Sequence, residues 1–335
     1  GYRVLGVFMK NFSEKNPITQ ECNWIEEKIM AQKIAAFLDI SLIILDLEKQ
    51  YTSQVIKPMI KAYNKGLTPN PDVACNTIIK FPWLRKAVKE HNCQFISTGH
   101  YARIKKQGNT HKLLRAKDES KDQSYFLSEL SQQDLKNTLF PIGNLKKSQV
   151  RKLAKKLKFP NANKPSTSGI CFVGRVKIKS FLERTIKNKI GKVLDTEGNI
   201  IGKHPGITYY TIGQRVGEHL GIEITKPKED STKKYYIAEK NAKTNTLIVA
   251  PENHPILSKK SCYLAKVHHI NPSVKFPSKV HVRIRHLGDL IPATITNKSN
   301  KVIVTFSKPI SALAAGQVLV VYKGKEVLGC GEIRY

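Results

Sequence analysis

The chain has 335 residues, of which 40% are hydrophobic, so it is long enough for two or three domains with their own cores. It carries 57 Lys and Arg against 26 Asp and Glu, a net charge of +31 that is typical of proteins binding a polyanion, most often nucleic acid. A lysine-rich proteome or a basic organelle would also give this charge. No apolar run is long enough to predict a membrane span.

The first half of the chain alternates strands with helices. Apolar runs predict strands at 4–9, 41–47 and 94–98, and helical spacing predicts helices at 24–38, 53–63 and 82–89, the second kinked at Pro58. This order predicts an α/β domain at 1–162 with a parallel sheet covered on both sides. Ligands of such sheets bind at the carboxyl ends of strands, where Met9, Gly99 and His100 fall.

The second half has a different pattern. A basic stretch at 146–192 and a Gly- and Tyr-rich stretch at 206–215 suggest a small central domain, placed at 163–228, and 226–234 resembles a linker. Short strands then predict an antiparallel β-barrel at 229–335. These strands are expected at 235–238, 246–250, 279–285, 291–295, 302–306, 317–322 and 326–333. In the strand at 279–285, alternation puts His281, Arg283 and Arg285 in a basic stripe on one face.

Six cysteines are scattered without a CxxC pair, which fits neither a disulfide scaffold nor a zinc site and indicates a reducing compartment. Cys75 follows the turn Asn70-Pro71-Asp72 and precedes a helical segment. A helix N-terminus there would lower the thiol pKa and favour the thiolate. A buried structural cysteine is about equally compatible with these residues.

Cys171 follows a hydroxyl-rich loop at 166–169 and is flanked by Lys164 and Arg175, which also favour a thiolate. A flexible loop would let a sulfur carrier reach both a donor and an acceptor. An inert cysteine packed beside Phe172 is the alternative. Two reactive thiols on a polycationic chain suggest sulfur chemistry on a nucleic acid.

Two polar segments suit contact with nucleotides. The sequence at 97–100 ends a predicted strand with a glycine, which permits close backbone approach, although an ordinary glycine turn would read the same way. The sequence at 121–125 offers a cation, an amide and an aromatic ring, which suit phosphate contact, base-edge hydrogen bonding and stacking. A solvated turn is the alternative there.

Together these segments resemble the tRNA-specific 2-thiouridylase (tRNA-uridine 2-sulfurtransferase) family, in order along nearly the whole chain. The resemblance is carried by GVFMKNF, TPNPDVACNTIIKF, STGHYAR, KDQSYFLS, LFPIG, SGICFVG, YYTIGQR, RIRH and AAGQVLVVYKG with LGCG. It implies a PP-loop (adenine nucleotide α-hydrolase-like) sheet domain, followed by a central domain and a barrel that grip tRNA. VAPENHPIL and the charge look more like the mitochondrial branch, which implies the matrix; a bacterial-type cytoplasmic protein is the alternative.

The resemblance implies adenylation of the C2 oxygen of wobble uridine (U34) by ATP with Mg²⁺, and replacement of that oxygen by sulfur. Cys171 would carry a persulfide from a cysteine desulfurase or sulfur-relay protein, and Cys75 would attack it or form a transient disulfide with Cys171. Met9 and Gly99 match adenylate-contacting positions, and Asn70, Pro71 and Asp72 match the target-base segment. Positions matching tRNA contacts are His100, Lys121, Asp122, Gln123, Arg283, Ile284 and Gln317. The substrates would be tRNAs of the Lys, Glu and Gln type, and no protein-bound metal site is implied.

Three departures from the family pattern stand out. The pyrophosphate loop of SGGVDSS type would precede Gly1, so we expect residues 1–335 alone not to adenylate efficiently. Ser166 replaces the usual Asp before the second cysteine, and Ile284 replaces an aromatic residue beside Arg283. A tRNA-binding protein without catalysis, or another PP-loop ATP pyrophosphatase, remains an alternative to the sulfurtransferase.

Overall fold

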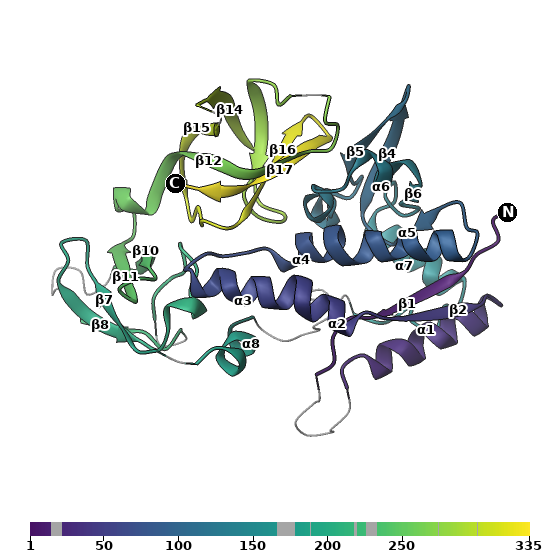
Figure 1. Cartoon of the computed structure of the whole chain (residues 1–335), viewed down its shortest axis with the longest axis horizontal. Helices are drawn as coiled ribbons and strands as arrows, with labels where there is room; N and C mark the ends of the chain where they lie inside the picture. The colour runs from purple at the N-terminus through teal and green to yellow at the C-terminus, as the bar shows by residue number, and fades with distance from the viewer. Residues whose placement is uncertain are drawn as a thin grey trace. The chain divides into compact units, whose positions relative to one another are not determined.

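The computed structural model describes residues 1–14, 22–165, 178–187, 189–217, 220–225, 233–273, 275–299 and 301–335 (Figure 1). The chain forms two compact units. Unit 1 comprises Gly1–Pro58 and Pro71–Ile178, and unit 2 comprises Met59–Asn70 and Lys179–Tyr335. No helix within the described ranges has the length and apolar character needed to cross a bilayer.

Unit 1 contains the predicted parallel pairing. Strand β1 (Gly6–Lys10) pairs with β2 (Leu42–Asp46), and α1 (Ile25–Phe37) makes the crossover between them. Strand β3 (Ile96–Ser97) pairs in parallel with β6 (Thr138–Leu139). The mixed α/β class is therefore confirmed, although the third predicted strand is only two residues long.

Two long helical stretches, the first of which continues into unit 2, each contain a π-helical segment before a proline. One runs through α2 (Glu48–Tyr51), η1 (Thr52–Ile56) and α3 (Lys57–Asn64), and the other through α4 (Pro71–Ala74), η2 (Cys75–Lys80) and α5 (Phe81–Glu90). Pro58 and Pro82 each occupy the second position of the α-helix that follows the π-helical segment. A wider π turn accommodates a residue that lacks an N–H and would clash with the preceding turn, so neither proline ends its helix.

The rest of unit 1 consists of a hairpin and short helices. Strands β4 (Ala102–Gln107) and β5 (Thr110–Arg115) pair antiparallel around Gly108, whose φ is +56°. Helix α6 (Gln132–Lys136) begins with a capping box between Ser131 and Asp134. The remaining elements are η3 (Glu119–Lys121), η4 (Ser124–Leu127) and α7 (Lys147–Lys156).

Unit 2 begins with a five-stranded sheet in the order β10-β11-β7-β8-β9. Its strands are β7 (Gly191–Leu194), β8 (Ile200–His204), β9 (Glu223–Ile224), β10 (Tyr235–Asn241) and β11 (Thr246–Pro251), with α8 (Ile178–Thr185) before them and η5 (Ile207–Tyr209) after β8. We expected the strands at 235–238 and 246–250 in the barrel, and this was wrong. Strand β11 instead pairs in parallel with β7. The prediction failed because strand propensity indicates where a strand forms but not which strand it pairs with.

The C-terminal barrel has six antiparallel strands and is the predicted architecture (Figure 1). Strand β12 pairs with both β15 and β17, which closes the barrel. Its core is formed by aliphatic and aromatic side chains from all six strands. The strands are β12 (Ser258–His269), β13 (Lys279–Arg283), β14 (Ile291–Lys298), β15 (Lys301–Ser311), β16 (Val318–Lys323) and β17 (Glu326–Arg334), with η8 (Pro255–Leu257) before them.

The expected basic stripe on β13 is not present as such. Val280 and Val282 face the core as predicted and His281 is exposed, but Arg283 is only 6% exposed. The Arg283 guanidinium lies 5.5 Å from the centre of the Tyr322 ring on β16. This cation–π contact accompanies the burial of a side chain that simple alternation would place in solvent.

Candidate functional site

Cys75 lies at the start of η2 and is completely buried. The helical stretch begins at Pro71, so the thiol lies one turn inside it, near the helix N-terminus as expected. The side-chain amide of Asn76 donates to the Asp72 backbone carbonyl at 3.0 Å, which ties the start of η2 to α4. Cys171 and the loop at 166–169 lie outside the described residues, so the approach of the two sulfur atoms stays a prediction.

The carboxyl end of β1 carries a buried amide that the sequence reasoning missed. Met9 is 8% exposed and Asn11 is 1% exposed, and neither the amide nitrogen nor the oxygen of Asn11 has a hydrogen-bond partner in the described part of the chain. Between them, Lys10 forms ion pairs with Asp46 and Glu48, each at 3.0 Å. The hydrogen bonds that the Lys10 ammonium donates to the Asp46 and Glu48 carboxylates raise the pKa of Lys10. An unsatisfied buried amide is costly, which makes this a place where a ligand would be stabilising.

Gly99 follows β3 and faces open space. A Cβ built on it would meet nothing within 4 Å, and its φ is not in the left-handed region. Neither packing nor backbone strain within the described residues therefore demands glycine here. The observation favours close approach of a ligand over the ordinary glycine turn, and the adenylate role stays a prediction.

His100 sits inside unit 1 between aromatic rings. Its ring stacks on Phe81 at 6.2 Å and meets Phe140 edge-on at 5.9 Å. Burial, followed by the charge of Lys80, holds the pKa of His100 well below its usual value, so the imidazole is neutral at pH 7. The Lys80 ammonium, which can only donate, is 3.4 Å from Nε2, so the ring proton lies on Nδ1 and points to the Thr98 hydroxyl at 2.7 Å.

The loop at 121–125 is mostly turned inward. Asp122 is fully buried, and its carboxylate accepts from the Ala116 amide at 3.0 Å and from the Ser124 hydroxyl at 3.0 Å. The Gln123 side chain accepts from the Tyr101 amide at 2.9 Å. Tyr125 is fully buried, so the expected stacking of a base on this ring is wrong: the ring belongs to the core. Lys121 alone of this group is exposed.

Lys147 and Arg151 lie near Lys121 of this loop, and the sequence reasoning missed these two cations. Burial lowers the pKa of Lys147, and repulsion by Arg151 and Lys121 lowers it further. The Lys147 ammonium also lies 5.4 Å from the centre of the Tyr101 ring. A cluster of cations that repel one another would be stabilised by a bound phosphate.

The predicted residues of unit 2 occupy different environments. Ile284 is 9% exposed and belongs to the barrel core, so its side chain has little surface for a tRNA contact. Gln317 is partly exposed just before β16, and Asn70 is partly exposed just before Pro71. Of the RNA contacts expected in the barrel, Gln317 is thus more accessible than Arg283 or Ile284.

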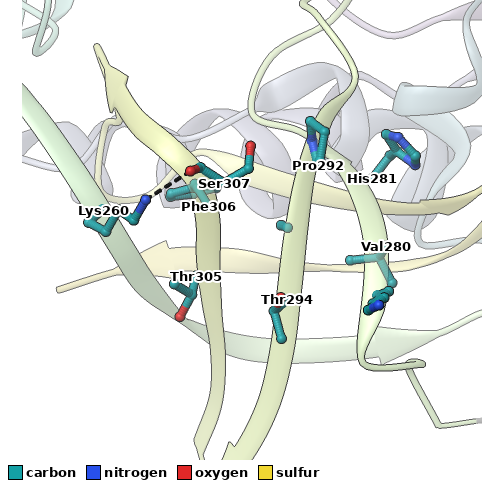
Figure 2. Close-up of a pocket in the computed structure, with 10 residues that line it drawn as sticks. Lys260, Val280, His281, Pro292, Thr294, Thr305, Phe306 and Ser307 are labelled. Atoms are coloured by element: carbon teal, nitrogen blue, oxygen red, sulfur yellow. Dashed lines mark hydrogen bonds between the residues drawn. The ribbon is translucent and has the colours of Figure 1, made fainter.

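A groove on the barrel has a volume of about 510 Å³. Figure 2 shows the side chains that line it. Lys279, Thr294 and Thr305 lie in one row across three strands, since the register pairs each with the next. The Lys260 ammonium donates to the Ser307 carbonyl at 2.9 Å at the edge of the groove. The lining residues are Lys260, Lys279, Val280, His281, Pro292, Ala293, Thr294, Thr305, Phe306 and Ser307. Lysine and hydroxyl side chains of this kind suit a phosphodiester backbone.

Family models match the chain in three consecutive parts. Residues 1–175 match a tRNA methyl transferase HUP domain, 179–251 a tRNA methyl transferase PRC-barrel domain, and 259–333 an aminomethyltransferase beta-barrel domain. The chain is 40% identical to the tRNA-specific 2-thiouridylase MnmA of Buchnera aphidicola, over 99% of this chain and 90% of that protein. The chain belongs to the tRNA-specific 2-thiouridylase family.

Two further relatives extend the comparison. The MnmA 1 protein of Geobacillus kaustophilus is 37% identical over 98% of this chain and 88% of its own length. The MnmA protein of Coxiella burnetii is 38% identical over 99% and 91%. The 2-thiouridylase assignment thus covers both units, and the resemblance seen in the sequence motifs is confirmed.

Proposed function

We propose that this chain is an ATP-dependent tRNA-uridine 2-sulfurtransferase that converts wobble uridine to 2-thiouridine. The observation that carries the proposal is the nearly full-length relationship to 2-thiouridylases, together with the Asn70–Cys75 motif at the start of a helical stretch in unit 1. Family membership supports transferase chemistry on tRNA. The persulfide route, the wobble position and the roles of single residues are our own assignment.

In the proposed reaction, Cys171 enters as a persulfide loaded by a cysteine desulfurase or sulfur-relay protein. ATP supplies the activation of the uridine C2 oxygen, which becomes part of the leaving AMP. The terminal sulfur of Cys171 bonds to C2 as the C2–O bond breaks, and Cys75 attacks the inner sulfur to give a Cys75–Cys171 disulfide. A thiol reductant then supplies two electrons to restore both thiols. Separating activation from sulfur attack replaces one hard substitution by easier steps.

The residues at the ends of β1 and β3 fit an adenine nucleotide. The Asn11 amide can donate and accept at once, which matches the edge of an adenine ring, and neither function is used within the described residues. Gly99 leaves room for close approach at the carboxyl end of β3. Met9, Asn11 and Gly99 would therefore hold the nucleotide, at the strand ends where ligands of parallel sheets bind.

For tRNA, we assign the cations Lys121, Lys147 and Arg151 and the barrel groove as phosphate contacts. Both supply cationic side chains in a chain whose net charge is +31. Contacts of this type fix the register of an RNA without reading its sequence. The choice among Lys, Glu and Gln tRNAs and the location in the mitochondrial matrix are proposals, and the latter is tested by localising the tagged full chain.

The test is mass spectrometry of wobble uridine in tRNA from cells that lack the gene. Loss of 2-thiouridine, with recovery when the full chain is restored, supports the proposal. Unchanged 2-thiouridine in the deletion would point to the alternative, a tRNA-binding protein without catalysis. Retained tRNA binding by the purified chain would then identify that alternative directly.

A further inference from the structure

Within unit 2, a loop of the barrel holds the segment that leads to the target-base motif. We call Gly66–Asn70 the leader segment and Ser311–Gln317 the barrel loop. The Thr68 amide donates to the Ala315 carbonyl at 2.8 Å, and Thr68 is only 5% exposed. At its other end, Gly66 packs against Ala242, whose Cβ would lie 3.4 Å from an added Cβ. The leader segment is therefore fixed from two sides.

Gly316 makes this contact possible. Its φ is +93°, and a Cβ on it would lie 2.8 Å from the Thr68 nitrogen and 2.9 Å from the Leu67 Cβ. Real Cβ atoms do not approach so closely, so any side chain at Gly316 would push the leader segment away. The backbone of the barrel loop thus touches the backbone of the leader segment directly.

The barrel loop is itself held by contacts on both sides, so it cannot easily move away from the leader segment. The Gly316 amide donates to the Ile333 carbonyl at 3.0 Å, which ties the loop to β17. On the other side Ala312 packs against Gly213, where an added Cβ would come within 2.2 Å of the Ala312 Cβ. Gly213 belongs to the Gly- and Tyr-rich stretch at 206–215, to which the proposed function gives no other role.

We propose that Gly316 is a positioning residue for the reaction, through the leader segment. This inference rests on the proposed function and on the family resemblance, which matches Gln317 to a tRNA contact and Asn70 to the target-base segment. These two residues are 247 positions apart, yet each directly adjoins the Thr68–Ala315 contact region. The barrel loop holds them in fixed register, so that docking of tRNA on the barrel sets the position of the target-base segment. Cys75 follows Asn70 by only five residues.

A shift of the leader segment should therefore damage chemistry more than binding. Misplacement by about 1 Å can cost roughly 100-fold in rate when reacting groups must align. Most phosphate contacts lie elsewhere, so affinity for tRNA should be nearly unchanged. A misaligned adenylated uridine would also be hydrolysed by water, which releases AMP without forming 2-thiouridine.

The test compares Gly316→Ala with Gly324→Ala in the full chain. Gly324 also has positive φ, +58°, and lies in the same barrel, but a Cβ on it meets nothing within 4 Å. Four quantities are measured: the rate of thiolation at saturating tRNA, the tRNA Kd, AMP released per 2-thiouridine formed, and the melting temperature. For Gly316→Ala we expect a rate at least about 10-fold lower than for Gly324→Ala, a Kd within about 2-fold of it, and a ratio of AMP to 2-thiouridine above one.

Equal rates for the two variants would overturn the inference. So would a parallel loss of tRNA binding, rate and melting temperature at an unchanged AMP ratio, because that pattern indicates a purely structural role. If the unsubstituted full-length protein, assayed with its phosphate loop present, makes no 2-thiouridine, the proposed function itself fails, and this control separates the two failures.

Discussion

His100 shows how burial can set the protonation of a residue that the family resemblance matches to a tRNA contact. Its ring is enclosed by Phe81 and Phe140 and faces the Lys80 ammonium. Since the folded-state pKa lies below the unfolded value of about 6.5, the unfolded chain binds more protons on acidification. Stability from this residue is present above about pH 6.5 and is lost as the pH falls below it.

We predict that His100→Gln flattens the pH dependence of unfolding between about pH 7 and 5. One proton corresponds to about 1.4 kcal/mol per pH unit, which is the largest slope that this residue can supply. Thermal melting across this pH range measures the effect, with the exposed His91→Gln as control. Some slope should remain, because burial also lowers the pKa of His204. Identical pH profiles for His100→Gln and His91→Gln would contradict the assignment.

Substitution of Asn11 should affect the stability of the chain and its binding of ATP differently. Because both ends of its amide are unsatisfied, Asn11→Ala should leave the melting temperature of the nucleotide-free chain unchanged or slightly raised. If the amide binds adenine, the same change should weaken ATP binding by about 10-fold. Calorimetric titration of the full chain with ATP measures this. A strong loss of stability with unchanged ATP affinity would show that the amide serves the fold instead.

At the scale of elements, the barrel groove offers a test of RNA binding. Replacing Lys260 and Lys279 by Gln should weaken tRNA binding and reduce the slope of log K against log salt by about 1 to 2. The matched control replaces Lys323 and Lys325, two lysines of the β16–β17 turn outside the groove lining. Filter binding at several salt concentrations measures both the tRNA affinity and its salt dependence for each pair of substitutions. Equal effects from both pairs would mean that only the overall charge of the barrel counts.

Element prediction succeeded where one residue pattern dominated. The apolar runs of β1 and β2 and the core-facing valines of β13 were predicted correctly from the sequence, whereas the exposed position expected for Arg283 was not. The longest strand, β12, was missed because lysines, histidines and irregular pairing interrupt its alternation. The helical stretches before Pro58 and Pro82 were predicted too short, because a π turn can absorb a proline and single-residue rules do not anticipate it.

At the scale of the whole molecule, the sequence motifs identified the family, whereas the burial and contacts of single side chains had to come from the structure. The sequence at 121–125 showed a cation, an acid, an amide and an aromatic ring, but only packing decides that Asp122 and Tyr125 are buried. The cluster around Lys147 and the contact between Gly316 and Thr68 join residues that are distant in the chain. No local pattern encodes such contacts, so sequence reasoning could not find them.

The most direct measurement of the central claim is the 2-thiouridine content of wobble-position nucleosides in cells that carry single cysteine variants of the full chain. Cys75→Ser and Cys171→Ser should each abolish 2-thiouridine while leaving the tRNA Kd nearly intact, and Cys93→Ser should match the unsubstituted protein. Wild-type levels of 2-thiouridine in both the Cys75→Ser and Cys171→Ser cells would contradict sulfur transfer through this pair of thiols.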